Sequence, residues 1–462
     1  MTPAAQPDLV MRDADLLVTM CGDEIPGGWV SVQDGVVDAV GAAGEEPAAA
    51  AELSARGCLV TPGLINTHHH IFQNLMRSYA PVVNSDWLVW REGLGPTWAR
   101  VDEEASYVSA WIGLAELALG GCTTTSDHIF LHPHPRLVDG AIAAAREVGV
   151  RLHAARGAMD LLHATGGYQE PALFETPDEI LADFERLAGE YHDPSPTAKI
   201  QIAFAPCSLM DSSPEVLRGA AELAERMDVR LHTHLAMSPP EADYCLTHYG
   251  QRPIDYFEEL GWAHSRSWVA HCNSVTSDEI GRLARWGTGV AHCPSSNMLL
   301  GLGAAPVGEM LRAGVHVGLG CDGSGATDHA SLWLEARAAL LLGRLIEGAA
   351  TGHRRMGARD VLEIATVGSA ACLGRSGELG VLAPGACADL VAWPLEGVRF
   401  AGAWTDPVEA WLRCGPVDAR HTVVGGRAIV RNGALELPKL DEMLREHERI
   451  SRSWQASALE TS

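Results

Sequence analysis

The sequence has no apolar run that approaches the ~18 residues needed for a membrane-spanning helix. Its N-terminus, MTPAAQPDLVMRDADLLV, also lacks the basic region and the continuous apolar region of a signal peptide. These two absences predict a cytoplasmic protein that does not enter a membrane.

Basic residues are few, with 34 Lys and Arg against 59 Asp and Glu and a formal net charge of −25. So negative a chain repels nucleic-acid phosphates and anionic lipids, which excludes both as partners and leaves small molecules. The 11 cysteines are odd in number and include no Cys-x-x-Cys pair, so they indicate neither a disulfide framework nor a structural zinc knuckle. We expect them to be buried small apolar residues in a reducing compartment.

The two ends of the chain are rich in short alternating stretches typical of antiparallel strands, such as DADLLVTM near the start and HTVVGGRAIVRNG near the end. Gly425-Gly426 predicts a tight turn between two of these strands. Neither end has enough strands to close a core alone. We therefore expect residues 1–60 and 373–435 to form one small β-sandwich, and residues 436–462 to form a polar helix and a frayed tail.

Residues 61–372 have a different sequence pattern, in which short apolar strands alternate with Ala/Leu/Glu/Arg-rich helical segments such as DEEASYVSAWIGLAELAL. The strand candidates are CLVTPGLIN, GCTTTSD, VRLHAARG, KIQIAFAP, VRLHTHLA, SWVAHC, GVAHCP and VHVGLGCDG. This alternation implies parallel strands with crossover helices, and eight strands over ~300 residues fit a (β/α)8, or TIM, barrel. A doubly wound open sheet is the alternative, although no Gly-x-Gly-x-x-Gly follows the first strand.

Side chains that can bind a metal stand at the ends of four predicted strands, where a barrel keeps its active site. His68 and His70 follow TPGLINT, and residues i and i+2 of a strand share a face. A second pair of histidines, His232 and His234, lies on one face of the strand VRLHTHLA. The other two signals are His271, which ends SWVAH, and Asp322, which ends VHVGLGCD.

Each of these signals also has an ordinary structural explanation, because a lone strand-end His is more often hydrogen-bonded than a ligand and a lone Asp often caps a helix. Four of eight strands rarely end in metal-binding side chains by chance. Imidazoles with one carboxylate suit zinc, and less often iron or manganese. The joint pattern predicts one divalent metal ion, with zinc expected and iron as the alternative.

Motifs along nearly the whole chain resemble the amidohydrolase superfamily, within it the branch of heterocycle deaminases and s-triazine hydrolases. The matching stretches are PGLINTHHH, HTHLA, AHC, AHCPSSN and GLGCDGS at the barrel strands and GVLAPGACADLV in the C-terminal sandwich segment. HAARGAM, AHCPSSNM and GLGCDGSGATD most resemble 8-oxoguanine deaminases and s-triazine hydrolases.

The resemblance implies roles for individual residues and an assembly. It implies that the metal ligands are His68, His70, His234 and Asp322. It also implies that His271 is a hydrogen-bonding partner of the water or the substrate. It also places three residues near the substrate: Gln73, Trp87 and Arg156. Relatives of this kind are commonly homodimers or larger, so we expect a homo-oligomer.

The chemistry expected of such a site is hydrolysis. A divalent ion lowers the pKa of its water to about 7 and so supplies hydroxide at neutral pH. Asp322 can accept the proton as hydroxide attacks an sp² carbon, and His271 can stabilise the developing charge. Collapse of the adduct expels an amine, so we predict cleavage of a C–N bond in a small heterocyclic substrate.

Three positions depart from these relatives, which usually carry a proton-shuttling Glu three residues after the fifth-strand histidine. This chain has Met237 there, and Ser274 and Leu299 replace a histidine and an arginine that relatives often carry. A missing general acid typically costs ~10²–10⁴-fold in rate. We expect Met237 and Leu299 to line a pocket for a more apolar or differently shaped substrate, or for a leaving group that needs less protonation.

Replacement acids and other functions stay open. Glu241 and His232 are candidate acids. However, we expect Glu241 to be a solvated carboxylate at a helix start and His232 to support the metal ligands. Asp322 alone can also make both proton transfers.

The alternative functions are hydrolysis of a lactam, amide or carbon–halogen bond, and an altered role in ligand binding or biosynthesis. Retention of the four ligands and His271 argues against a protein that only binds.

Overall fold

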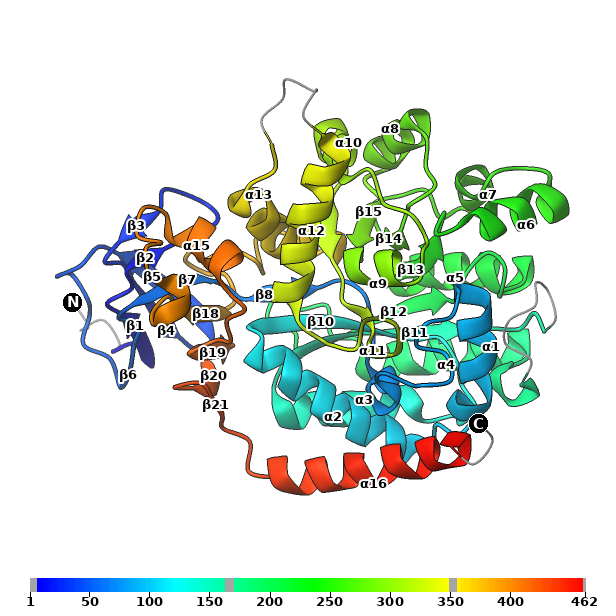
Figure 1. Ribbon diagram of the computed structural model, residues 1–462, viewed down its shortest axis with the longest axis horizontal. Helices are drawn as coiled ribbons and strands as arrows, with labels where there is room; N and C mark the ends of the chain where they lie inside the picture. Colours follow the sequence, from blue (N-terminus) through cyan, green and yellow to red (C-terminus); the bar gives the residue numbers. More distant parts are fainter. Residues whose placement is uncertain (1–5, 163–169, 349–354, 460–462) are drawn as a thin grey trace.

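The computed structural model describes residues 6–162, 170–348 and 355–459 and shows a large barrel beside a small sandwich (Figure 1). The first residues of the expected sandwich segment, 1–5, and the end of the expected tail, 460–462, lie outside the described residues.

The large part is a closed barrel of eight parallel strands in the order β10-β11-β12-β13-β14-β15-β16-β8. These strands are β8 (Leu64–Asn66), β10 (Cys122–Ile129), β11 (Arg151–Ala158), β12 (Ile200–Pro206), β13 (Arg230–Leu235), β14 (Ser267–His271), β15 (Gly289–His292) and β16 (Val317–Leu319). The predicted (β/α)8 barrel is confirmed, and the open-sheet alternative is wrong because β16 pairs with β8 and closes the sheet.

Helices cover the outside of the barrel and join its strands (Figure 1). They are α1 (Trp87–Trp98), α2 (Glu103–Leu119), α3 (Leu137–Val148), α4 (Pro177–Tyr191), α5 (Pro214–Met227), α6 (Pro239–Tyr249), α7 (Pro253–Glu259), α8 (Ser277–Trp286), α9 (Pro294–Leu299), α10 (Val307–Ala313), α11 (Ser324–Thr327), α12 (Leu332–Glu347), α13 (Ala358–Glu363) and α14 (Ser369–Cys372). Side-chain caps start several of them; Thr176 and Glu179, for example, form a capping box at the start of α4.

The small part is a sandwich of two sheets, ordered β5-β4-β1-β6 and β21-β20-β19-β18-β7-β2-β3. Its N-terminal strands are β1 (Leu9–Arg12), β2 (Leu16–Leu17), β3 (Ile25–Pro26), β4 (Trp29–Gln33), β5 (Val36–Gly41), β6 (Ala51–Ser54) and β7 (Cys58–Pro62). Its C-terminal strands are β18 (Leu390–Pro394), β19 (His421–Val424), β20 (Arg427–Arg431) and β21 (Ala434–Leu435). The antiparallel pairing of β7 with β18 joins the two ends of the chain, so the predicted sandwich is confirmed.

Three glycines lie at points where the backbone leaves no room for a side chain or needs a positive φ. Gly63 separates β7 from β8, and a Cβ added there would lie 2.0 Å from Oγ1 of Thr123. One predicted strand, CLVTPGLIN, is therefore split between the sandwich and the barrel. Gly425 and Gly426 have φ of 54° and 78°, as the predicted tight turn between β19 and β20 requires.

The last two helices lie outside the barrel strands. Helix α15 (Pro407–Cys414) packs on the sandwich side, and α16 (Leu440–Leu459) runs beneath α2 (Figure 1). Ser451 of α16 donates a 2.8 Å hydrogen bond to the carbonyl of Leu75, so the predicted polar helix is anchored to the barrel. Among the described helices, none combines the length and the apolarity needed to cross a membrane. All eleven cysteines are free, and nine of them are buried.

Candidate metal centre

The predicted ligands lie at the mouth of the barrel, just beyond the carboxyl ends of the strands. A short parallel pair of strands, β9 (His69–His70) and β17 (Asp322–Gly323), sits there, with Asp322 opposite His69 and Gly323 opposite His70. This pairing brings the end of the first barrel strand beside the end of the last one. The two halves of the predicted site, far apart in the sequence, therefore meet.

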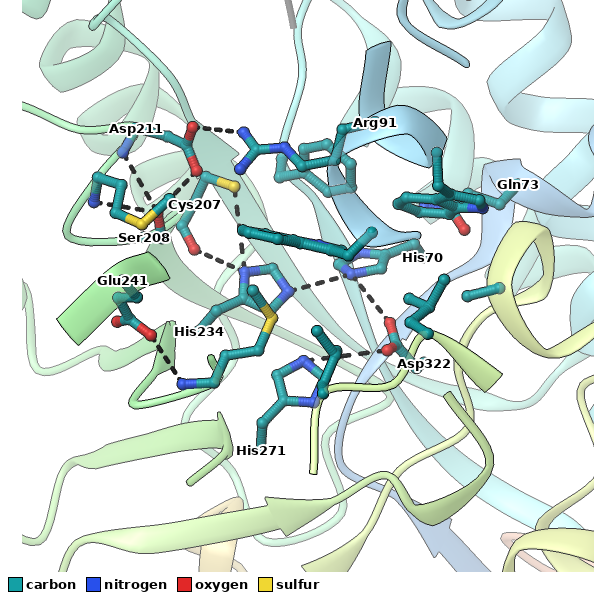
Figure 2. A pocket seen from close by; sticks show the side chains of 18 residues that line it. His70, Gln73, Arg91, Cys207, Ser208, Asp211, His234, Glu241, His271 and Asp322 are labelled. Carbon is teal, nitrogen blue, oxygen red and sulfur yellow. Dashed lines mark hydrogen bonds and ion pairs between the residues drawn. The ribbon is translucent and has the colours of Figure 1, made fainter. Parts of the chain in front are cut away.

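The donor atoms of the predicted ligands lie close together. His70 Nε2 lies 3.3 Å from Asp322 Oδ1 and 3.3 Å from His234 Nε2. His68 Nε2 lies 3.6 Å from the same Asp322 oxygen. Figure 2 shows His70, His234 and Asp322 turned toward one another around a shared space. One cation can contact side chains that are this close.

Hydrogen bonds behind the imidazoles fix which nitrogen faces the centre. His70 Nδ1 is 2.6 Å from the carbonyl of His128, and His234 Nδ1 is 2.6 Å from the carbonyl of Cys207. A carbonyl can only accept, so each Nδ1 carries a proton and donates it. Each Nε2 is then a lone-pair donor available to a metal.

His68 is oriented by a second imidazole instead of a carbonyl. Its Nδ1 lies 2.8 Å from Nε2 of His232, whose own Nδ1 lies 3.0 Å from the carbonyl of Trp268. His232 therefore donates to Trp268 and accepts from His68. His232 therefore lies behind His68, on the side of the ring that faces away from the cluster.

The donor set suits a divalent cation. His68 Nε2 is buried and has no hydrogen-bond partner among the described residues, and an unpaired buried nitrogen is costly unless something binds it. Burial and the neighbouring imidazoles lower the pKa of His70 to about 3, so its ring is neutral at pH 7, as a metal ligand must be. Burial alone would raise the pKa of Asp322, but the surrounding imidazoles hold it well below its usual range.

His271 faces the same centre from the end of β14. Its Nε2 is 3.9 Å from Asp322 Oδ2, and its Nδ1 is 2.9 Å from Oδ1 of Asn297. The orienting residue Asn297 stands in the AHCPSSN motif, but its role was not predicted because only its position after β15 reveals it. The backbone is unusual here, with φ of 77° at His271 and 58° at Asp322, a conformation that non-glycine residues adopt mainly where function requires it.

His128 is a neighbour of the cluster that the sequence reading missed. One of its ring nitrogens lies within 4.8 Å of the ligand nitrogens of His68, His70 and His234. However, its Nε2 is already 2.7 Å from the carbonyl of Ala205. The strand candidate GCTTTSD ended one residue before His128, so no strand-end signal was visible there.

A pocket of about 570 Å³ opens over the cluster. Its walls are largely aromatic and apolar, with a polar group at one side. The lining residues are His70, Gln73, Trp87, Trp90, Arg91, Phe130, Cys207, Ser208, Met210, Asp211, His234, Met237, Glu241, His271, Leu300, Leu302, Asp322 and Ala326. Three residues expected near the substrate, Gln73, Trp87 and Met237, are therefore in its wall.

Two other residues expected near the substrate, Arg156 and Leu299, are not among the lining residues. Successive residues of a strand face opposite sides; His153 packs on Trp268 inside the barrel, so Arg156, three residues on, points outward to Glu175 and Asp183. Leu299 ends α9 with 61% of its surface exposed, and the next residue, Leu300, faces the pocket instead.

The expectation of a solvated Glu241 is wrong. Only 1% of Glu241 is exposed, and it lines the pocket. Helix α6 starts with two prolines, and its first turn folds the Glu241 side chain back so that it accepts a 2.7 Å hydrogen bond from the backbone N–H of Met237 (Figure 2). Polarity at a helix start gave no sign of this burial.

The polar side of the pocket was also missed by the sequence reading. Arg91 of α1 donates to Asp211 at 2.5 Å, and the other carboxylate oxygen of Asp211 accepts a 2.6 Å hydrogen bond from Ser208. The guanidinium of Arg91 also lies 5.0 Å from the centre of the Trp87 ring. None of the three polar residues follows a motif that identifies such a role.

Comparison with known proteins agrees with this geometry. Residues 59–429 match the model of the amidohydrolase family. An 8-oxoguanine deaminase from Pseudomonas aeruginosa is 42% identical over 441 residues, which cover 95% of this chain and 97% of that protein. A hydroxydechloroatrazine ethylaminohydrolase from Pseudomonas sp. strain ADP is 39% identical and covers 85% of this chain and 81% of its own length.

The fold agrees as well. The crystal structure of an atrazine chlorohydrolase from Arthrobacter aurescens TC1, complexed with zinc, superposes with a TM-score of 0.90 at 30% identity. The match covers 96% of this chain and all of that one. This chain belongs to the amidohydrolase family, in the branch of heterocycle deaminases and triazine hydrolases.

Proposed function

We propose that this protein is a metal-dependent hydrolase that uses water to cleave a C–N bond of a small heterocyclic substrate, with zinc as its metal. The observation that carries the proposal is the convergence of three imidazole nitrogens and one carboxylate oxygen beside a mostly apolar pocket. Relatives named as deaminases and an aminohydrolase support the reaction, and a relative complexed with zinc supports the metal.

The ligands in this proposal are His68, His70, His234 and Asp322. When bound there, a divalent cation activates a water molecule by lowering its pKa to about 7. The second oxygen of Asp322 lies toward His271, at 3.9 Å, and so is free to take the proton that the water loses. His271, held by Asn297, is positioned to stabilise charge on the oxygen that attacks.

The pocket walls determine how a substrate is held. Trp87, Trp90 and Phe130 offer faces and edges that suit a flat ring. The side-chain oxygen of Gln73 accepts a 3.2 Å hydrogen bond from the N–H of Gly325, which fixes the orientation of the amide. Its Nε2 is buried without a partner among the described residues, so we infer that it donates to a ring nitrogen or carbonyl of the substrate.

A release assay tests this function. The protein is loaded with zinc and incubated with a panel of purines, pterins, triazines and pyrimidines, and free ammonia or amine is measured. We expect release from at least one of these classes, its loss after a chelator removes the metal, and its return with zinc. Asp322→Asn should release nothing detectable. Fully loaded protein that releases no amine from any member of the panel contradicts the proposal.

A second candidate reaction, hydrolysis of a carbon–halogen bond, is favoured by one observation. Met237 lines the pocket at the position where relatives usually carry a proton-shuttling Glu, and its side chain cannot protonate a leaving group. A halide leaves without a proton. Chloride release from chlorinated members of the same panel, without amine release from their amino analogues, would favour this reaction.

A further inference from the structure

Three carboxyl groups line the pocket, and they differ in their surroundings. Asp322 belongs to the metal cluster, and Asp211 is tied to Arg91 and Ser208. Glu241 has no cation as a partner among the described residues; its Oε2 accepts a 2.7 Å hydrogen bond from the N–H of Met237. Of the three, Glu241 alone is neither a ligand nor half of an ion pair.

Glu241 also has an unused oxygen. Oε2 accepts the hydrogen bond from Met237, while Oε1 is buried and has no hydrogen-bond partner in the described part of the chain. A buried oxygen without a partner costs free energy, and such groups in a pocket commonly find their partner in a ligand. Figure 2 shows Glu241 on the same side of the pocket as Ser208 and His234.

The groups that face Glu241 favour its neutral form. Asp211 and Cys207 face it from the end of β12, Cys272 from the end of β14, and Cys245 from its own helix. None of these carries a positive charge. Burial, reinforced by Asp211, outweighs the backbone N–H groups of residues 236–238, which favour the charged form, and raises the pKa of Glu241 to about 7. A carboxyl group poised near the working pH can both give and take a proton.

We propose that Glu241 is the proton donor and acceptor of this active site, in place of the acid that Met237 cannot supply. The proposal rests on the function proposed above and adds a catalytic residue to it. Its Oε1 would contact the ring nitrogen of a cyclic amidine, that is, a ring carbon doubly bonded to a ring nitrogen and carrying an amino group.

The proton balance closes with two carboxyl groups. The water oxygen bonds to the ring carbon, one water proton goes to Asp322, and the electron pair of the C=N bond moves to the ring nitrogen, which takes the proton of Glu241. Collapse then returns the remaining hydroxyl proton to Glu241 and forms the C=O bond. The C–N bond to the amino group breaks, and the amine leaves with the proton held by Asp322. One water is consumed, and both carboxyl groups regain their starting states.

The central experiment is Glu241→Gln, which keeps an acceptor for Met237 and removes the transferable proton. We expect kcat to fall by ~10²–10⁴-fold, with unchanged zinc content and melting temperature. In the wild type, kcat should decline as the pH rises above about 7, because the acid form is lost. In the variant this alkaline decline should vanish.

The matched control is Glu335→Gln. Glu335 is also fully buried, with a pKa raised by burial to about 8, and it accepts a hydrogen bond from the N–H of Ser295, but it does not line the pocket. We expect this variant to keep its kcat and its pH profile. A general effect of replacing a buried carboxyl group would appear in both variants.

A series of substrates whose rings differ in electron density distinguishes proton transfer by Glu241 from a role in positioning the substrate. Electron-poor rings hold an extra electron pair on nitrogen without a proton, so the loss of kcat in Glu241→Gln should shrink as the ring becomes more electron-poor. The proposal is overturned if the variant keeps the wild-type kcat, or if it loses the same factor with every ring. Wild-type protein that turns over no ring at all overturns the proposed function and this proposal together.

An infrared measurement covers the case in which Glu241→Gln does not fold. The wild-type protein should show a protonated carboxyl band that titrates near pH 7 and shifts when a lactam product binds. Burial also raises the pKa of Asp127 to about 7, so persistence of the band and of its shift in both Glu335→Gln and Asp127→Asn supports the assignment to Glu241. A wild-type spectrum without such a band overturns the proposal.

Discussion

His232 shows how a residue that does not touch the centre can control it. Its ring stands between Nδ1 of His68 and the carbonyl of Trp268, so it fixes which nitrogen of His68 carries the proton. Residues in this position typically change metal affinity by ~10–100-fold when they are replaced. We expect His232→Ala to weaken zinc binding by about that factor, measured by competition with a chelator of known affinity.

The control for this prediction is His132→Ala. His132 is buried and hydrogen-bonded to the carbonyl of Ile129, but it does not line the pocket. It should change stability without changing the affinity for zinc. Equal zinc affinities in His232→Ala and the wild type would show that His68 keeps its orientation unaided.

For single residues, the sequence predicted the position of side chains on one face of a strand better than the position of side chains set by the fold of a loop. Alternation along a strand placed His68 and His70 together because both belong to one short stretch. The same alternation along β11 turns Arg156 outward, whereas the family resemblance predicts it near the substrate. Glu241 was misjudged because its burial depends on how α6 folds back over the loop before it, which residue type alone does not reveal.

Helix α1 contributes more residues to the pocket wall than any other helix. Trp87, Trp90 and Arg91 all lie on it. Asp86 caps its start by accepting hydrogen bonds from the N–H groups of Leu88 and Val89. The cap therefore fixes the first turn, from which Trp87 reaches the pocket.

We expect Asp86→Ala to lower the free energy of unfolding by about 1 kcal/mol and to raise KM more than it lowers kcat, because α1 holds the ring but makes no proton transfer. Steady-state kinetics and urea unfolding test both effects. Asp102→Ala is the matched control, since Asp102 caps α2, which contributes no pocket residue. A rise in KM in both variants would contradict the role given to α1.

All eight barrel strands were predictable from the alternation of short strands with helical patterns, and most of them are also apolar runs, although β10, CTTTSDHI, is mostly polar. The strands that complete the site were not. β9 and β17 are two residues long each and exist only because distant segments pair. Local sequence carries no periodicity over two residues, so the convergence of Asp322 with the first histidines followed from the barrel topology and the resemblance rather than from those strands.

At the scale of the whole molecule, the buried histidines make stability depend on pH. Burial lowers the pKa of His132 and His153 well below 6.5 and that of His292 to about 4. Above pH ~6.5 the folded and the unfolded chain both leave these rings neutral. Between about 6.5 and 4 the unfolded chain binds protons that the folded chain excludes, so stability is lost as the pH falls.

We therefore expect the contribution of these rings to the free energy of unfolding of the metal-free protein to change little from pH 8 to 7 and to fall with increasing slope from pH 6 to 4.5, by up to ~1.4 kcal/mol per pH unit for each fully excluded proton. The buried carboxyl groups of Glu241 and Glu335, with pKa raised to about 7 and about 8, contribute in the opposite sense, so the rings are tested by replacing them one at a time. Urea unfolding across this range measures the slope. His292→Gln should reduce the slope by about one proton. The same slope in His292→Gln and in the wild type would mean that the His292 ring is protonated in the fold.

One buried ion pair links the barrel to the sandwich. Arg151 at the start of β11 contacts both carboxylate oxygens of Asp389, which precedes β18, at 2.8 and 3.1 Å, and both side chains are almost fully buried. Asp389 also accepts a 2.8 Å hydrogen bond from the N–H of Gly425 in the β19–β20 turn. The contact therefore joins three segments that are distant in the sequence.

Because charge on Arg151 would stay buried without its partner, we expect Asp389→Asn to lower the free energy of unfolding by about 3–5 kcal/mol. Arg151→Met combined with Asp389→Leu removes both charges and should recover a large part of this loss. Glu52→Gln, which breaks an exposed ion pair with Arg12, is the control and should cost at most about 1 kcal/mol. Zinc content should be unchanged in all three, since the pair lies at the end of β11 away from the metal centre. If Asp389→Asn costs no more than the control, the sandwich and the barrel are held together by their apolar contacts rather than by this pair.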